Sequence, residues 1–360
     1  MMGWTLGQYL FRRYIVIMAW LFVGTFALIF IIDFAEFSSR TSSLPAFTLP
    51  LSLAIIGMRV PMFMQQTVPF IALLATMVLL VNLNRRSELV IIRAAGISVW
   101  RFLLPLGISA FLFGLLIILV FNPLAAAGLA SSQLYEANMR ASSPSSTDVV
   151  PWMRQKAGNV DTIIGARASL NQGTELADAS FFTLDENQTI GERLDADRAY
   201  LRDGYWELVN VERFREGSHE SNIASVNIPT NLRPEFVQER LATPETISIY
   251  QLPSTIRVAQ SFGLRANAFA MQFHYLLALP PLLVAMTIIA ATVSLRFTRT
   301  GISVPLILSG IVAGFLLYVV SVLVKAFGSS GIVPPVVAAW FPVLIAMFFG
   351  VTYLLYREDG

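Results

Sequence analysis

The stretch Asn84–Ser98, NRRSELVIIRAAGIS, decides the fold because it is a charged interruption between two long apolar segments. Residues 61–81 precede it and residues 102–121 follow it, and each segment is close to the roughly 20 apolar residues that cross a bilayer. A short charged stretch between two spanning helices lies at one membrane surface. We therefore expect residues 84–98 to form an elbow on the cytoplasmic side, on which a second protein pushes.

The whole chain is too apolar for a soluble domain. Of its 360 residues, 55% are hydrophobic and only 13% are charged, whereas soluble domains have about a quarter of their residues charged. The run Tyr14–Ile32 exceeds the apolar core of a signal peptide, and no small-x-small cleavage site follows it. We predict an α-helical polytopic membrane protein with six transmembrane helices, at residues 13–32, 61–81, 102–121, 268–295, 302–325 and 333–356.

Positive charges beside the spans predict the orientation of the chain. Lys and Arg are enriched in short cytoplasmic loops, and long loops are left out of the count. Nine arginines fall on the side of the termini, and three cations fall on the other side. Both termini are thus predicted to be cytoplasmic. The nine are Arg12, Arg13, Arg85, Arg86, Arg93, Arg101, Arg296, Arg299 and Arg357, and the three are Arg40, Arg59 and Lys325.

The long middle segment differs from the rest in composition. It holds 18 of the 23 carboxylates, since only Asp33, Glu36, Glu88, Glu358 and Asp359 lie outside residues 122–264. Short alternating runs such as DGYWELVNVERF, divided by Gly, Asn and Asp, are typical of half-buried antiparallel strands. The prediction is an inserted all-β domain, jelly-roll-like, at residues 123–263 with linkers. Residues 1–122 and 264–360 carry the first three and the last three transmembrane helices, and residues 84–98 form a coupling helix.

Signatures of catalysis and of metal binding are missing from the sequence. There is no cysteine, no Gly-x-x-x-x-Gly-Lys-Ser/Thr loop for ATP and no Gly-x-Ser-x-Gly elbow. His219 and His274 lack metal-ligand spacing, and His274 is interpreted as a packing residue or, alternatively, as a proton relay. We predict no catalytic residue, no metal and no cofactor bound by this chain, and the basic ends beside lipid do not imply nucleic acid.

Two glutamines interrupt the second predicted span. Gln65 and Gln66 lie between Pro61 and Pro69, and amide side chains facing lipid are costly. Either this part of the helix faces protein or a polar cavity, or the helix begins only near Thr67.

The elbow has two opposed sides when residues 84–98 are placed on a helix that begins at Asn84 and ends at Gly96. Glu88 shares its side with Ile91 and Ala95, with Ile92 at the edge, while Arg86, Arg93 and Ile97 lie opposite. Two interpretations remain open at this point. Glu88 pairs with a cation on a cytoplasmic partner while the arginines meet lipid headgroups, or Glu88 is exposed and pairs weakly with Arg85.

The same stretch resembles the coupling segment of the LptF/LptG permease family, R-R-S-E-L-V-x-x-R-A-A-G-x-S. YLFRRYIVIMAWLF is similar to the family's first helix, and GIVPPVVAAWFPVLIAMFFGVTYLL is similar to its last. The residues of the last helix that fit the LptG branch better than the LptF branch are Pro334, Pro335, Ala338, Ala339, Trp340 and Pro342. The resemblance covers essentially the whole chain. It implies that Glu88 docks into an ATPase, with Arg85, Arg86, Arg93, Ile91 and Ala95 around it.

The resemblance also implies partners and a cargo. The chain would be one permease half of an ATP-binding-cassette exporter in the bacterial inner membrane, which extracts lipopolysaccharide and passes it to a periplasmic bridge. Expected partners are LptF, a dimer of the ATPase LptB, LptC, the bridge through LptA, and membrane lipids. ATP and Mg would be bound by the partner ATPase. The inserted β domain would be a periplasmic jelly roll.

A cavity for lipopolysaccharide would be apolar inside and basic at its outer rim, because lipid A carries phosphates. The cations expected there are Arg40 and Arg59, although both are equally explained by contact with anionic headgroups. Asp33 and Met62 stand where a lysine can be found in the family. The acyl-chain contacts that we predict, each equally explained by helix packing, are Phe26, Phe30, Phe63, Phe70, Leu74, Ile307, Ile311 and Phe315.

Two other functions fit a membrane protein of this kind. An ion-coupled carrier of lipid or amphiphile would carry carboxylates inside its spans, whereas Asp33 and Glu36 lie only at the end of one. A non-transporting scaffold that presents the β domain leaves the arginine-rich elbow unexplained.

Overall fold

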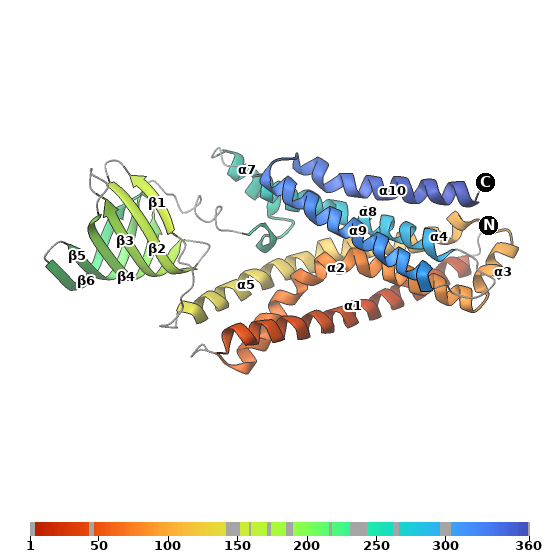
Figure 1. Cartoon of the computed structure of the whole chain (residues 1–360), viewed down its shortest axis with the longest axis horizontal. Helices are drawn as coiled ribbons and strands as arrows, with labels where there is room; N and C mark the ends of the chain where they lie inside the picture. Colours follow the sequence, from red (N-terminus) through yellow and green to blue (C-terminus); the bar gives the residue numbers. More distant parts are fainter. Residues whose placement is uncertain are drawn as a thin grey trace. The chain divides into compact units, whose positions relative to one another are not determined.

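A computed structural model describes residues 4–42, 47–141, 152–157, 160–170, 174–184, 190–215, 218–230, 243–261, 266–295 and 304–358. The chain divides into two compact units. One comprises residues 1–33, 59–128 and 247–360 and is helical, and the other comprises residues 34–58 and 129–246 and contains the β-sheet (Figure 1).

Six of the described helices are long and apolar enough to cross a membrane, which confirms the predicted class. The first three extend well beyond the apolar runs that predicted them, because polar residues at both ends continue the helical backbone, whereas the last three stay within five residues of the predicted ends. The helices are α1 (Trp4–Thr41), α2 (Leu49–Arg85), α3 (Glu88–Ala94), α4 (Val99–Leu116), α5 (Asn122–Ala141), α7 (Leu252–Ser261), α8 (Asn267–Ser294), α9 (Val304–Ser330) and α10 (Pro335–Glu358), with a 3₁₀ turn at Pro244–Thr246.

The third span continues past the predicted boundary at residue 122. A π-helical turn, Ile117–Phe121, joins α4 to α5, and one apolar helix runs over Val99–Glu136. The residues of α5 include many alanines, which favour helix. The first described strand begins at Trp152.

Helix α8 is the centre of the helical unit. It contacts α4, α9 and α10, and most of its side chains in the apolar stretch are buried. Glycines let other helices approach closely. A Cβ atom at Gly114 of α4 would lie 2.7 Å from the Cα of Pro280 in α8, and one at Gly314 of α9 would lie 2.3 Å from Leu73 Cδ1 in α2. Small residues at such crossings are typical of helix pairs in membranes.

The β unit is one antiparallel sheet in which each strand pairs with its neighbours in sequence, in the order β1-β2-β3-β4-β5-β6. Among the described strands the pairing is that of a meander, without the crossover of a jelly roll. The inserted all-β region itself is confirmed. The strands are β1 (Trp152–Ala157), β2 (Val160–Leu170), β3 (Glu175–Leu184), β4 (Ile190–Arg202), β5 (Tyr205–Arg215) and β6 (Ser218–Pro229).

The sheet curls until its two edges approach one another (Figure 1). Thr230, which follows β6, donates a hydrogen bond from its hydroxyl to the Gln155 side chain in β1, at 2.6 Å. The concave side is filled by apolar residues, with Phe181 and Trp206 in edge-to-face contact at 6.1 Å between ring centroids. One sheet rolled on itself thus encloses this apolar core.

Candidate functional site: the elbow and the outer arginines

The elbow is shorter and more sharply turned than the predicted helix of residues 84–98. Asn84 and Arg85 still belong to α2, and Ser87 adopts a left-handed backbone with φ of 59°. Such a φ is uncommon for residues other than glycine, and it ends the helical path before α3 begins at Glu88. Gly96, with φ of 74°, lies beyond the end of α3 as predicted. The helix inside the stretch predicted to couple to a partner is therefore only Glu88–Ala94.

The Glu88 carboxylate is held by two side chains from the first helix. The guanidinium of Arg13 donates to Glu88 Oε2 at 3.1 Å, and the hydroxyl of Tyr9 donates to the same oxygen at 3.0 Å. The Arg13 guanidinium also donates to the Tyr9 hydroxyl and lies over its ring. Neither interpretation of Glu88 from the sequence included this contact, because Arg13 and Tyr9 precede Glu88 by 75 and 79 residues.

One face of α3 is apolar and exposed. Leu89 and Ile92 are buried against the helical unit, whereas Ile91 is 66% exposed and Val90 is 49% exposed. Ala94 and Ala95 extend this face by one turn. Arg85 and Arg86 are exposed beside it, and Arg93 is half-buried. An exposed apolar patch with charged neighbours is typical of a protein-binding surface.

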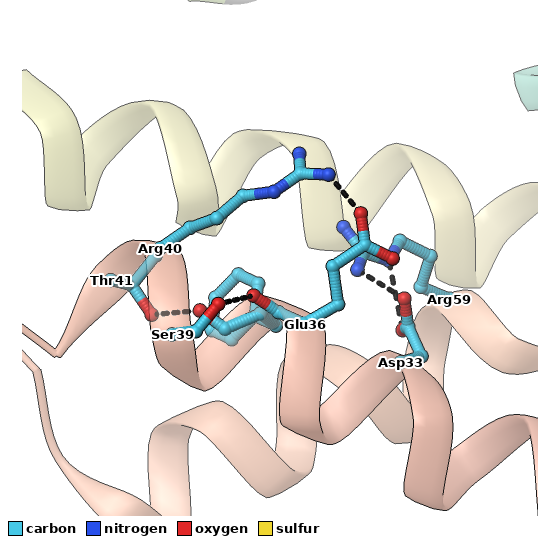
Figure 2. A network of polar contacts seen from close by, with 7 residues as sticks. Asp33, Glu36, Ser39, Arg40, Thr41 and Arg59 are labelled. Atoms are coloured by element: carbon cyan, nitrogen blue, oxygen red, sulfur yellow. Dashed lines mark hydrogen bonds and ion pairs between the residues drawn. The ribbon is translucent and has the colours of Figure 1, made fainter.

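The outer arginines are both paired with carboxylates of the same chain, as Figure 2 shows. The guanidinium of Arg59 in α2 donates to both carboxylate oxygens of Asp33 in α1, at 2.5 Å and 3.1 Å. Arg40 forms an ion pair with Glu36 one turn earlier in α1. Each expected phosphate contact therefore has its charge balanced within the chain.

The comparison with known proteins agrees with the family resemblance of the elbow sequence. Residues 8–357 match the model of a family described as lipopolysaccharide export system permease LptF/LptG. The chain belongs to this family. A curated relative, the lipopolysaccharide export system permease protein LptG of Haemophilus influenzae, is 24% identical over 315 residues, which cover 84% of each chain. As a member of this family with six apolar helices, the chain is a multi-pass inner-membrane protein and a transporter component.

In this LptF/LptG family permease, the predicted acyl-chain residues are divided among three helices. Phe26 and Phe30 stack in α1 at 6.2 Å between ring centroids. Phe63 in α2 and Phe315 in α9 are exposed. Partly buried are Phe70, Leu74 and Ile311, and the side chain of Ile307 is not among those that the structure describes. The apolar stretches of α1 and α9 are mostly exposed, so both helices offer apolar surface to lipid or to another subunit.

The permease contains two buried polar clusters, of which the first was not predicted from the sequence. Tyr14 of α1 donates from its hydroxyl to the Ala72 carbonyl of α2 at 3.3 Å and lies 3.2 Å from the Thr287 hydroxyl of α8. The only signal for this cluster was a tyrosine inside an apolar run. The cluster joins α1, α2 and α8, and Tyr14 directly follows Arg13 in α1.

The second cluster decides between the two interpretations of the glutamines. The Asn122 amide donates to the buried Gln65 side chain at 3.2 Å, and its oxygen accepts the backbone N–H of Ile249 at 2.9 Å. Because α2 begins at Leu49, the helix does not start near Thr67. Gln65 faces protein, and Gln66 lines a cavity.

Proposed function

We propose that this chain is one of two permease halves of an ATP-driven exporter that extracts lipopolysaccharide from the inner membrane and passes it to a periplasmic bridge. The other half would be LptF, the energy would come from an LptB dimer, and LptC with LptA would receive the cargo. Membership of the lipopolysaccharide export permease family supports the cargo. Both termini would be cytoplasmic and the β domain periplasmic, as the arginine distribution predicts.

The observation that carries the proposal is the exposed face of α3. This face is a small apolar patch formed by Val90, Ile91, Ala94 and Ala95, and α3 is too short to span the membrane. We infer that this patch enters a groove of LptB, with Arg85, Arg86 and Arg93 around it. Glu88, which remains 27% exposed beside Arg13, would meet a cation of LptB at the edge of that groove.

The contact of Glu88 with α1 adds a route for the force. A push on α3 would reach α1 through Arg13 and Tyr9, and α1 carries Phe26, Phe30 and Asp33 further along. We therefore propose that ATP binding by LptB moves α1 together with α3. The outer surface of α1 would then change its position around the acyl chains of the cargo.

The residues that the structure describes do not support the alternative of an ion-coupled carrier. The carboxylates of Asp33 and Glu36, which would have to bind the coupling ion, are both paired with arginines. No specific observation favours it.

Purification of the complex followed by extraction of lipopolysaccharide tests the proposed function. The tagged chain should co-purify with an ATPase, and the complex in nanodiscs should release lipopolysaccharide to a periplasmic acceptor only with ATP. Depletion of the chain in its source cell should also lower surface lipopolysaccharide. An isolated chain without an ATPase, together with normal surface display after depletion, would overturn the proposal.

A further inference from the structure

The third span contains a joint at the π-helical turn Ile117–Phe121, which lies between α4 and α5. Here the N–H of Asn122 donates to the carbonyl of Ile117, five residues earlier instead of four. Pro123 explains the position of the joint. In an α-helix the Leu119 carbonyl would accept from the N–H of residue 123, but proline has no N–H and its ring crowds that carbonyl. Single π-helical turns inside α-helices are frequent at functional sites.

The extra residue of the π-helical turn decides which side chains of the third span face α1. Phe113 in α4 and Phe121 both contact Phe22 of α1 edge to face, at 5.9 Å and 5.5 Å between ring centroids. Two residues eight positions apart in a uniform α-helix point about 80° apart. The π-helical turn accommodates one additional residue and brings both rings to the same side. Asn122, which comes next, is turned by the same amount and is fully buried.

The chain that returns from the β unit is fastened to this joint by two hydrogen bonds. The hydroxyl of Tyr250 donates to the Leu119 carbonyl at 2.9 Å, and the N–H of Ile249 donates to the side-chain oxygen of Asn122 at 2.9 Å. We call these two bonds the clasp. The Asn122 amide also donates to Gln65 of α2 at 3.2 Å, so the clasp is tied to the second span as well.

The clasp joins the two points at which the chain leaves and re-enters the helical unit. That unit includes residues up to Gly128 and resumes at Ile247. Asn122 precedes the exit by six residues and Ile249 follows the return by two, although they are 127 positions apart in the sequence. Joining the ends of a loop removes conformational freedom from it. Both connections of residues 129–246 to the helical unit are therefore held together by the clasp.

We propose that the clasp transmits movement of the third span to the β unit, with Tyr250 and Asn122 as positioning residues. When the third span shifts or turns, Leu119 and Asn122 move with it, and the two bonds make the return segment follow. Without the clasp only α5 would follow, because it is continuous with the third span. The role in transport rests on the proposed function: delivery of the cargo to a periplasmic acceptor would depend on the clasp, whereas ATP hydrolysis would not.

Hydrogen exchange in the purified complex tests the clasp itself. Tyr250→Phe removes one hydroxyl donor at a residue that is 62% exposed. Since both bonds open together when the return segment lifts, the amide of Ile249 should exchange about fivefold faster, as expected for the loss of one hydrogen bond. Tyr356→Phe, at a tyrosine of α10 that is 85% exposed, is the matched control and should change nothing. Exchange at the wild-type rate in Tyr250→Phe would overturn the clasp.

Transport by the complex in nanodiscs that contain lipopolysaccharide tests the transmission of movement. For each ATP hydrolysed, Tyr250→Phe should deliver about fivefold less lipopolysaccharide to a periplasmic acceptor, while the rate of ATP hydrolysis stays within about twofold of wild type. A general loss of structure would instead lower both quantities. Unchanged delivery per ATP would overturn transmission through the clasp. No delivery by the wild-type complex would overturn the proposed function instead.

Pro123→Ala opens the clasp by an independent route. It restores the N–H at residue 123, so the third span can continue as an α-helix and turn Asn122 away from Ile249. We expect the same loss of delivery per ATP as in Tyr250→Phe, and no further loss in the double variant, because both changes act on one contact. Additive losses would overturn the connection between the π-helical turn and the clasp.

Discussion

The guanidinium of Arg13 lies 3.1 Å from the carboxylate of Glu88, so the first helix is fastened to the elbow between the second and third spans. The two side chains are 19% and 27% exposed. The ion pair is therefore partly buried, between a fully solvated surface pair and a fully buried pair. It makes the residue expected to meet the ATPase a structural partner of α1 as well.

The Arg13–Glu88 pair can be measured by a double-mutant cycle. Partial exposure screens the interaction, so we expect a coupling free energy of about 0.5–1 kcal/mol between Arg13→Gln and Glu88→Gln. The measurement is unfolding of the chain by SDS in mixed micelles. The charge swap, Arg13→Glu with Glu88→Arg, should recover the stability but not the association with LptB, whose cation would then face a cation. Arg12→Gln is the matched control, and a coupling free energy of zero would contradict the prediction.

Substitution of Ile91 tests the apolar face of α3. Ile91→Glu places a charge where a partner must exclude water, and we expect the amount of co-purified ATPase to fall at least tenfold. Because Ile91 is 66% exposed, folding should be unaffected. Ile332→Glu, at a residue that is 73% exposed between α9 and α10, is the control. ATPase recovery equal to wild type would show that this face is not the interface.

Removal of the Asp33 charge should change binding of phosphate near the outer end of α1. Asp33→Asn leaves the Arg59 guanidinium without its counter-charge, and we expect roughly three- to tenfold tighter binding of phosphorylated lipid A, with a loss of about 1–3 kcal/mol of stability. Titration of lipid A with the complex measures the affinity. Glu36→Gln, which opens the exposed pair with Arg40, should also tighten the binding of lipid A if Arg40 contacts phosphate, but it should cost little stability. Unchanged affinity in Asp33→Asn would remove Arg59 from the set of substrate contacts.

The orientation can be mapped with single cysteines because the chain has none. Asp203→Cys lies in the exposed turn between β4 and β5, and Arg86→Cys lies in the exposed elbow. A membrane-impermeant maleimide added to cells with a permeabilised outer membrane should label Asp203→Cys. Arg86→Cys should react only after lysis. The reverse pattern would invert the predicted topology.

The sequence predicted the spans well because the signal is local. A run of about 20 apolar residues is sufficient evidence for a spanning helix, wherever it packs. The ends were harder to predict, since Asn122 and Pro123 resemble the start of a loop although α5 continues the helix. At the elbow, the left-handed backbone of Ser87 separates α2 from α3, and serine rarely adopts it. One continuous helix was therefore the natural but wrong expectation.

The ion pairs could not be predicted because they join distant positions. Nothing near Glu88 indicates that Arg13 will reach it, and nothing near Arg59 indicates Asp33, 26 residues earlier. Spacing on one helix relates only residues three or four apart, as for Arg40 and Glu36. Lys325 was visible in the sequence as a cation beside a span, but its contact with the ring of Tyr275 joins two different helices and could not be predicted.

The close approach of α9 to α2 at Gly314 has a consequence for the cavity that Gln66 lines. Gly314 precedes Tyr318, which also lines this cavity, by one helical turn, and even a methyl group there would meet Leu73. From outside the cavity, Gly314 therefore sets how closely α9 can approach α2. A larger residue at position 314 would act as a wedge between α9 and Leu73, while every residue that lines the cavity stayed the same.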